Sequence, residues 1–137
     1  MQNSIFLKIV LCISGLVAIA IAGSILLSPT DFYAVNHINL GGNLNLLSEI
    51  RAPAGALLSF GILMLTGAFI SRLAFTSILI STLLYLAYGL SRFAGMLIDG
   101  LPVDTLIWSA VIEVILGLFS LFCLWKFQLP QSKQELK

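Results

Sequence analysis

The sequence predicts an all-α integral membrane protein, a bundle of four transmembrane helices, and three observations support this fold class. Hydrophobic residues make up 59% of the 137 residues and charged residues only 9%, with a mean hydropathy of +1.06. Soluble domains contain roughly 25% charged residues, and a chain this short has too little interior to bury so much apolar surface. The apolar residues also lie in four continuous runs, each close to the ~20 residues that a helix needs to cross a bilayer.

The same composition excludes several classes of protein. An ordinary cytosolic enzyme and a disordered tail would both carry more charge, and a formal net charge of +1 offers no basic surface for a nucleic acid. Because the apolar runs are continuous instead of alternating, they favour helices over a β-barrel. The sequence contains no internal repeat and no low-complexity segment, so we expect residues 1–137 to form a single domain.

The first helix is expected over about residues 5–27. This segment resembles a cleaved secretory signal, because Lys8 precedes an apolar core and Ala20-Ile21-Ala22 mimics a cleavage site. The apolar run continues past that site through Leu27, which favours a helix that is retained and spans the membrane.

The other three helices are expected at about residues 52–70, 73–98 and 103–125. Residues that break helices lie between these runs or near their ends: Gly41, Gly42, Pro53, Gly100 and Pro102. Pro53 is expected either to open the second helix in its first turn or to kink it. In the connection that precedes this helix His37 lies beside Asn36 and other asparagines, and it is expected to be a solvated loop residue and not a base.

The distribution of basic residues predicts that both termini are cytoplasmic. Four spans place both termini on one side of the membrane, and the opposite side holds only Arg51 and Arg92. The side of the termini holds five basic residues: Lys8, Arg72, Lys126, Lys133 and Lys137. Because cytoplasmic segments carry the excess of Lys and Arg, we expect a multi-pass protein of the inner (cytoplasmic) membrane.

No residue pattern predicts a metal site or a cofactor. Cys12 and Cys123 both fall near the cytoplasmic ends of their helices, and no His or other Cys stands at ligand spacing from them. We therefore expect both to be small apolar helix residues with reduced thiols.

The candidate functional residues are charged or polar residues within or beside the apolar runs. Glu113 lies about ten residues into the fourth helix, roughly 15 Å from its outer end. A charge at that depth costs on the order of 2.5–3.5 kcal/mol, so this carboxyl group must face the bundle interior and find a partner, or be protonated. Helical spacing places four polar residues on one face of the third helix: Ser81, Tyr85, Tyr88 and Arg92.

Arg92 is the expected partner of Glu113. Its depth below the outer end of the third helix differs from that of Glu113 by only about 5 Å, which an arginine side chain can reach. We expect an ion pair between them, with Tyr85 or Tyr88 donating a hydroxyl hydrogen bond.

Three further charges are expected near the outer interface. Glu49 and Arg51 are two residues apart and point in different directions, so each needs a partner elsewhere, such as Asp99 for Arg51 or Arg92 for Glu49. The candidate ligand-binding residues are therefore Glu49, Arg51, Tyr85, Tyr88, Arg92, Asp99 and Glu113. No residue pattern identifies a catalytic group.

Three short motifs resemble one family in their order along the chain. The first is Glu49-Ile50-Arg51-Ala52 with Gly55, the second is Arg92 with Gly95 and then Asp99-Gly100 and Pro102, and the third is Glu113 with Gly117. They resemble the second, third and fourth helices of the domain-of-unknown-function 4345 family. The resemblance implies a bacterial inner-membrane protein of four helices and supplies no activity. More distantly, the layout resembles the DoxX-type small membrane proteins.

A pocket for an amphiphile, opening toward the outer leaflet, is the preferred function. An arginine would hold an anionic or carbonyl head group, and apolar helix faces would hold the tail of a lipid, isoprenoid or quinone. Catalysis stays open, because a desolvated Glu113 could exchange protons, although no nucleophile–base pair, metal cluster or phosphate loop supports it.

Two other functions stay open. In a structural or assembly subunit the buried charges would fix helix register, and the small residues Ser14, Ala18 and Ala22 would pack against a second copy or another membrane protein. Proton or ion movement through Glu113 is the third, although no continuous polar file accompanies this carboxylate.

Overall fold

Every regular element in residues 4–128, the part of the chain that the computed structural model describes, is a helix. The elements in chain order are α1 (Ile5–Leu27), α2 (Pro29–Ala34), α3 (Leu44–Phe69), α4 (Ser71–Asp99) and α5 (Asp104–Gln128). All except α2 are long and apolar enough to cross a membrane. This confirms the predicted all-α fold with four transmembrane helices.

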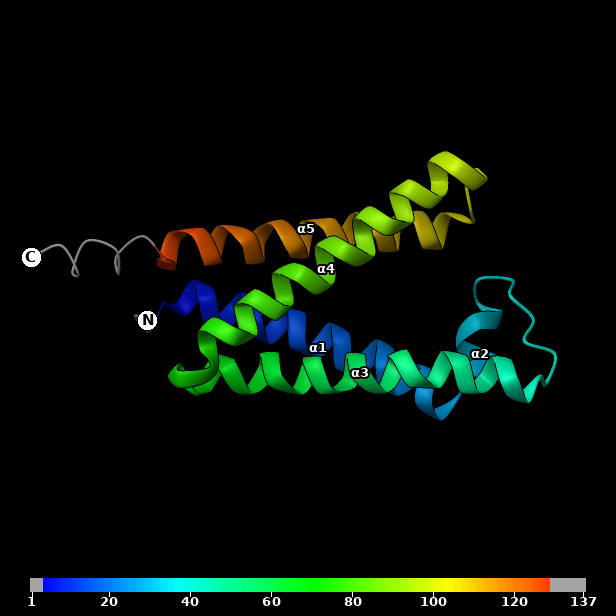
Figure 1. Cartoon of the computed structure of the whole chain (residues 1–137), viewed down its shortest axis with the longest axis horizontal. Helices are drawn as coiled ribbons and strands as arrows, with labels where there is room; N and C mark the ends of the chain where they lie inside the picture. The colour runs from blue at the N-terminus through cyan, green and yellow to red at the C-terminus, as the bar shows by residue number, and fades with distance from the viewer. Residues whose placement is uncertain (1–3, 129–137) are drawn as a thin grey trace, which may run out of the picture.

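The four long helices run roughly side by side, and α1 begins where α5 ends (Figure 1). We name this end of the bundle the terminal end. The opposite end, which holds α2 and the connections at residues 35–43 and 100–103, is the loop end. Lys8, Arg72 and Lys126 lie at the terminal end, whereas Lys133 and Lys137 lie outside the described residues.

Most of the outside of the bundle is apolar. Large hydrophobic side chains stay exposed on the long helices, such as Leu83 at 62%, Leu97 at 89% and Phe119 at 49%. In water a continuous apolar surface of this kind would drive association, whereas hydrocarbon solvates it without penalty. The exposed side chains therefore fit a lipid environment.

Two elements differ from the expected ones. α3 begins at Leu44 instead of near residue 52, because the Asn43 side chain accepts hydrogen bonds from the backbone N–H groups of Asn45 and Leu46 at 3.0 and 3.3 Å and caps the helix. Pro53 lies inside α3 and does not open it. The connection after α1 contains the short helix α2, which Pro29 begins with a dihedral angle preset for helix.

The four spans form two closely packed pairs, α1 with α3 and α4 with α5. In the first pair a Cβ atom on Gly15 would lie 2.8 Å from the carbonyl oxygen of Gly61, so the two backbones touch. In the second pair a Cβ atom on Gly89 would lie 3.0 Å from the backbone nitrogen of Val114. Small residues therefore set the close approach within each pair.

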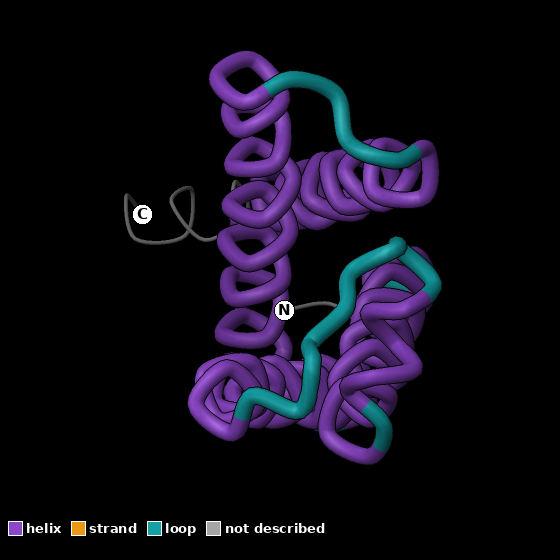
Figure 2. Tube along the Cα trace, turned by 90° about the vertical axis from the view of Figure 1, so that its right-hand side faces the viewer, coloured by secondary structure: helices purple, strands orange, loops and turns teal. Residues whose placement is uncertain are grey.

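The two pairs meet mainly in the terminal half of the bundle. The buried apolar core there includes Leu11 of α1, Met64 of α3, Ile78 of α4 and Cys123 of α5. α3 also packs directly against α4, where the Ser77 hydroxyl donates to the backbone carbonyl of Leu63 at 2.7 Å. Toward the loop end α4 runs obliquely away from α3 (Figure 1), and it lies along the side of the bundle between α3 and the start of α5 (Figure 2).

Candidate functional site

A cavity of about 470 Å³ lies in the loop-end half of the bundle, where the two helix pairs separate. Cavities of roughly 300–1,000 Å³ are typical of sites for small molecules. Most of its wall is apolar, with side chains from all five helices that include Ile21, Ile25, Phe32, Leu57, Leu84, Leu106 and Ile112. The polar side chains that line it are Tyr33, Asn36, Tyr85, Tyr88, Arg92, Ser109 and Glu113.

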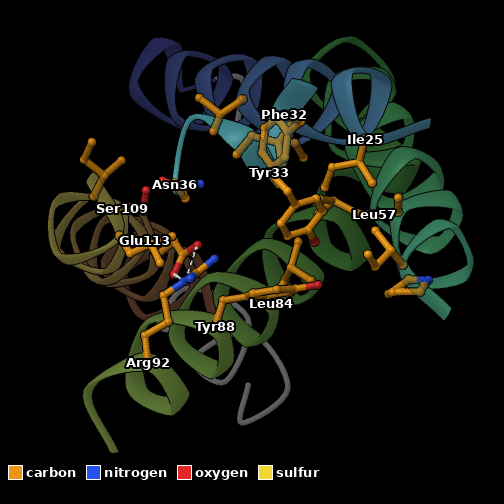
Figure 3. Close-up of a pocket in the computed structure, with 18 of the residues that line it drawn as sticks. Ile25, Phe32, Tyr33, Asn36, Leu57, Leu84, Tyr88, Arg92, Ser109 and Glu113 are labelled. Atoms are coloured by element: carbon orange, nitrogen blue, oxygen red, sulfur yellow. Dashed lines mark hydrogen bonds and ion pairs between the residues drawn. The ribbon is translucent and has the colours of Figure 1, made fainter. Parts of the chain in front are cut away.

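Arg92 of α4 and Glu113 of α5 form an ion pair in the cavity wall (Figure 3). The Arg92 Nε–H donates to both carboxylate oxygens, at 3.2 Å to Oε1 and 3.0 Å to Oε2. The Arg92 side chain is 35% exposed and that of Glu113 13%. The predicted pair is therefore present, because the two residues lie at the same depth on neighbouring helices.

The predicted polar face of α4 exists, but its members have different partners. The Ser81 and Ser120 hydroxyls hydrogen bond to each other at 2.8 Å, and neither serine lines the cavity. The Tyr85 hydroxyl donates to the backbone carbonyl of Ser14 on α1, while part of its ring lines the cavity. One face of α4 thus contacts both α1 and α5.

The expected hydroxyl bond to the ion pair is wrong for both tyrosines. Tyr85 lies seven residues from Arg92, about 10 Å along the helix axis, so its hydroxyl reaches across to α1 instead of along α4. Tyr88 lies nearer and lines the cavity, yet its hydroxyl has no hydrogen-bond partner within residues 4–128.

Glu49, Arg51 and Asp99 do not line the cavity. All three are exposed, and the Arg92–Glu113 contact is the one ion pair among the residues that the structure describes. The expected partnerships of Arg51 with Asp99 and of Glu49 with Arg92 are therefore wrong. The reason is geometric: α3 extends back to Leu44, and the end of α4 that carries Asp99 runs away from it.

The sequence prediction missed Ser109 of α5 and the cavity residues from α2 and the connection after it. Phe32 and Tyr33 line the cavity, with their rings edge to face at a centroid distance of 5.4 Å. Asn36 also lines it, and its Oδ1 accepts a hydrogen bond from the Thr105 hydroxyl of α5 at 2.6 Å. His37, the expected solvated loop residue, is exposed. Pro29 after Ser28 was the available signal for this helix.

The chemistry of the site is that of hydrogen-bond donors beside an apolar wall. The Ser109 hydroxyl donates to the Thr105 carbonyl at 2.8 Å. The Nη groups of Arg92 have no partner within residues 4–128, so they are available to another molecule. In the same part of the chain no three His, Cys, Asp or Glu side chains are grouped to hold a metal ion. The cavity can therefore accommodate a molecule with an apolar body and a polar end.

Comparison with known proteins identifies one family. A model described as a domain of unknown function, DUF4345, matches residues 6–124, a range that covers nearly all of the four spans. Comparisons with curated proteins and with solved structures gave no match. The match agrees with the resemblance of the three motifs that contain Glu49, Arg92 and Glu113. The chain therefore belongs to the DUF4345 family.

Proposed function

We propose that this protein binds a lipid-like amphiphile, such as a lipid, isoprenoid or quinone, in the cavity between its two helix pairs. One observation carries the proposal: the cavity wall is mostly apolar and includes Arg92, whose Nη groups are free of partners within residues 4–128. An apolar tail would lie against α1 and α3, and the polar head would lie at Arg92 and Tyr88.

The proposal includes an orientation in the inner membrane, with both termini cytoplasmic and the cavity in the outer half. Lys8, Arg72 and Lys126 at the terminal end support it, because cytoplasmic segments carry the excess of basic residues. At the loop end Arg92 is engaged in the cavity wall, which leaves Arg51 as the exposed basic residue there within residues 4–128.

The alternative role, a structural or assembly subunit, has less support. Ser14, Gly15, Ala18 and Ala22 of α1 are buried within the chain itself, so this small-residue face is not free for a partner. An ion pair that only fixed helix register would also need no open space beside it, whereas Arg92 borders a cavity of about 470 Å³.

The test is ligand retention by the full chain after purification in a mild non-ionic detergent. Native mass spectrometry of the wild type should detect a bound amphiphile, and Arg92→Ala should lose it. Arg51→Ala is the matched control, because it removes the same charge from an exposed position outside the cavity. Arg51→Ala should retain the ligand.

A further pair of outcomes separates binding from folding. The double variant Arg92→Leu/Glu113→Leu leaves neither an unpaired charge nor a hydrogen-bond donor at these two positions, so it should stay folded and yet lose the ligand. A wild type that is consistently empty, or equal retention by Arg92→Ala and Arg51→Ala, would overturn the proposed function.

A further inference from the structure

We infer that the head group held in this cavity is uncharged and accepts hydrogen bonds, as the carbonyl of a ketone, a quinone or an ester does. The inference rests on the proposed function and names the class of ligand. It follows from two properties of the cavity wall, its formal charge and its free hydrogen-bonding groups.

The wall carries no net formal charge. Arg92 is its one cationic residue and Glu113 its one anionic residue. They neutralise each other across distances of 3.0 and 3.2 Å. An anionic head group would have to compete with Glu113 for the same guanidinium, and the cavity would then hold two negative charges against one positive charge. In a wall of low polarity such an excess charge is strongly unfavourable.

The Arg92 guanidinium leaves hydrogen-bond donors without a partner in the wall. A guanidinium has five N–H donors and no acceptor, and Glu113 engages only the Nε–H. The Nη groups therefore need acceptors that the protein does not supply within residues 4–128. Asn36 adds an amide whose Oδ1 is already engaged by Thr105. The Tyr88 hydroxyl can donate as well.

These two properties together select one class of head group. A neutral carbonyl accepts two hydrogen bonds without adding charge, so it satisfies the Nη donors and leaves the Arg92–Glu113 pair intact. A cationic head group would have to compete with Arg92 for the Glu113 carboxylate, and the cavity would then hold two positive charges against one negative charge. A purely apolar molecule would leave the donors unsatisfied.

The test compares two probes of equal chain length, a methyl alkyl ketone and an alkyl sulfonate, on the purified full chain in a non-ionic detergent. The wild type should bind the ketone at least about tenfold more tightly than the sulfonate. In Glu113→Gln the amide oxygen can still accept from the Arg92 Nε–H, but the charge of Arg92 is no longer neutralised. The sulfonate should then gain about tenfold and the preference should reverse.

Glu49→Gln is the matched control, because it removes the same charge from an exposed residue outside the cavity and should leave the preference unchanged. A wild type that binds the sulfonate as tightly as the ketone would overturn the inference and leave the proposed function standing. The same holds if Glu113→Gln folds and keeps the wild-type preference. Binding of neither probe would overturn the proposed function and the inference with it. The ranking of the probes by the wild type decides the inference even if Glu113→Gln does not fold.

Discussion

Both helix pairs pack through close glycine contacts, and they differ in the polar links between their helices. In both, glycine lets two backbones touch, at Gly15 and Gly61 in the α1/α3 pair and at Gly89 in the α4/α5 pair. The α4/α5 pair adds two polar links, the Ser81–Ser120 hydrogen bond and the Arg92–Glu113 ion pair. No side-chain hydrogen bond joins α1 to α3 within residues 4–128.

This difference separates the roles of the pairs around the cavity. The α1/α3 pair contributes apolar wall residues, such as Ile21 and Leu57, whereas α4 and α5 contribute the charged ones. In a membrane, close packing alone holds apolar helices together, while polar links also fix which residues face each other. The charged residues of the site therefore lie on the α4/α5 pair, in which the polar links fix which residues face each other.

The largest expected effect is on the glycine contact of the α1/α3 pair. In Gly15→Leu the new Cβ would lie 2.8 Å from the carbonyl oxygen of Gly61, which is too close for the two helices to keep their contact. We therefore expect a loss of stability of about 3 kcal/mol. Gly23→Leu on the same helix is the control, because a Cβ there meets no atom within 4 Å. Thermal unfolding in detergent measures both. Equal unfolding temperatures for the two variants would contradict the backbone contact.

The second prediction separates the two tyrosines of α4. Tyr85→Phe removes the hydroxyl that links α4 to the Ser14 carbonyl of α1, so it should cost about 1 kcal/mol of stability and leave ligand retention unchanged. Tyr88→Phe should leave stability unchanged, because the Tyr88 hydroxyl has no partner within residues 4–128, and should weaken ligand binding. Unfolding temperature and retained ligand are measured together for each variant. The reverse pattern would show that the roles are exchanged.

The smallest expected effect concerns the serine link of the α4/α5 pair. Ser81→Ala removes the 2.8 Å hydrogen bond to Ser120, and interhelical hydrogen bonds in membranes contribute about 0.6 kcal/mol. Ligand retention should not change, because neither serine lines the cavity. Unfolding in a graded denaturing detergent should resolve the difference. A loss of the ligand in this variant would show that the site depends on the whole α4/α5 contact.

The sequence was sufficient for the features that hydropathy and depth determine. Four apolar runs predict the four spans, and the matched depths of Arg92 and Glu113 predict their pair, because a buried charge must find a partner. The expected partners of Arg51 and Asp99 were wrong. Their contacts depend on how far apart the helices lie in the plane of the membrane, and the depth of a residue does not determine that distance.

The loop end was the least predictable part. Asn43 caps α3 and moves its start to Leu44, and α2 brings Tyr33 and Asn36 against the cavity. These features depend on short polar segments in which hydrophobic periodicity gives no signal. Their cap and proline motifs indicate where a helix begins, and they do not indicate which surface it covers.

The most direct test of the central claim is an experimental structure of the wild-type chain in a lipid nanodisc. We predict density for an amphiphile between the α1/α3 and α4/α5 pairs, with its polar end within hydrogen-bond distance of the Arg92 Nη groups. A closed interface between the pairs, with apolar side chains filling the space around Arg92 and no bound molecule, would contradict the account.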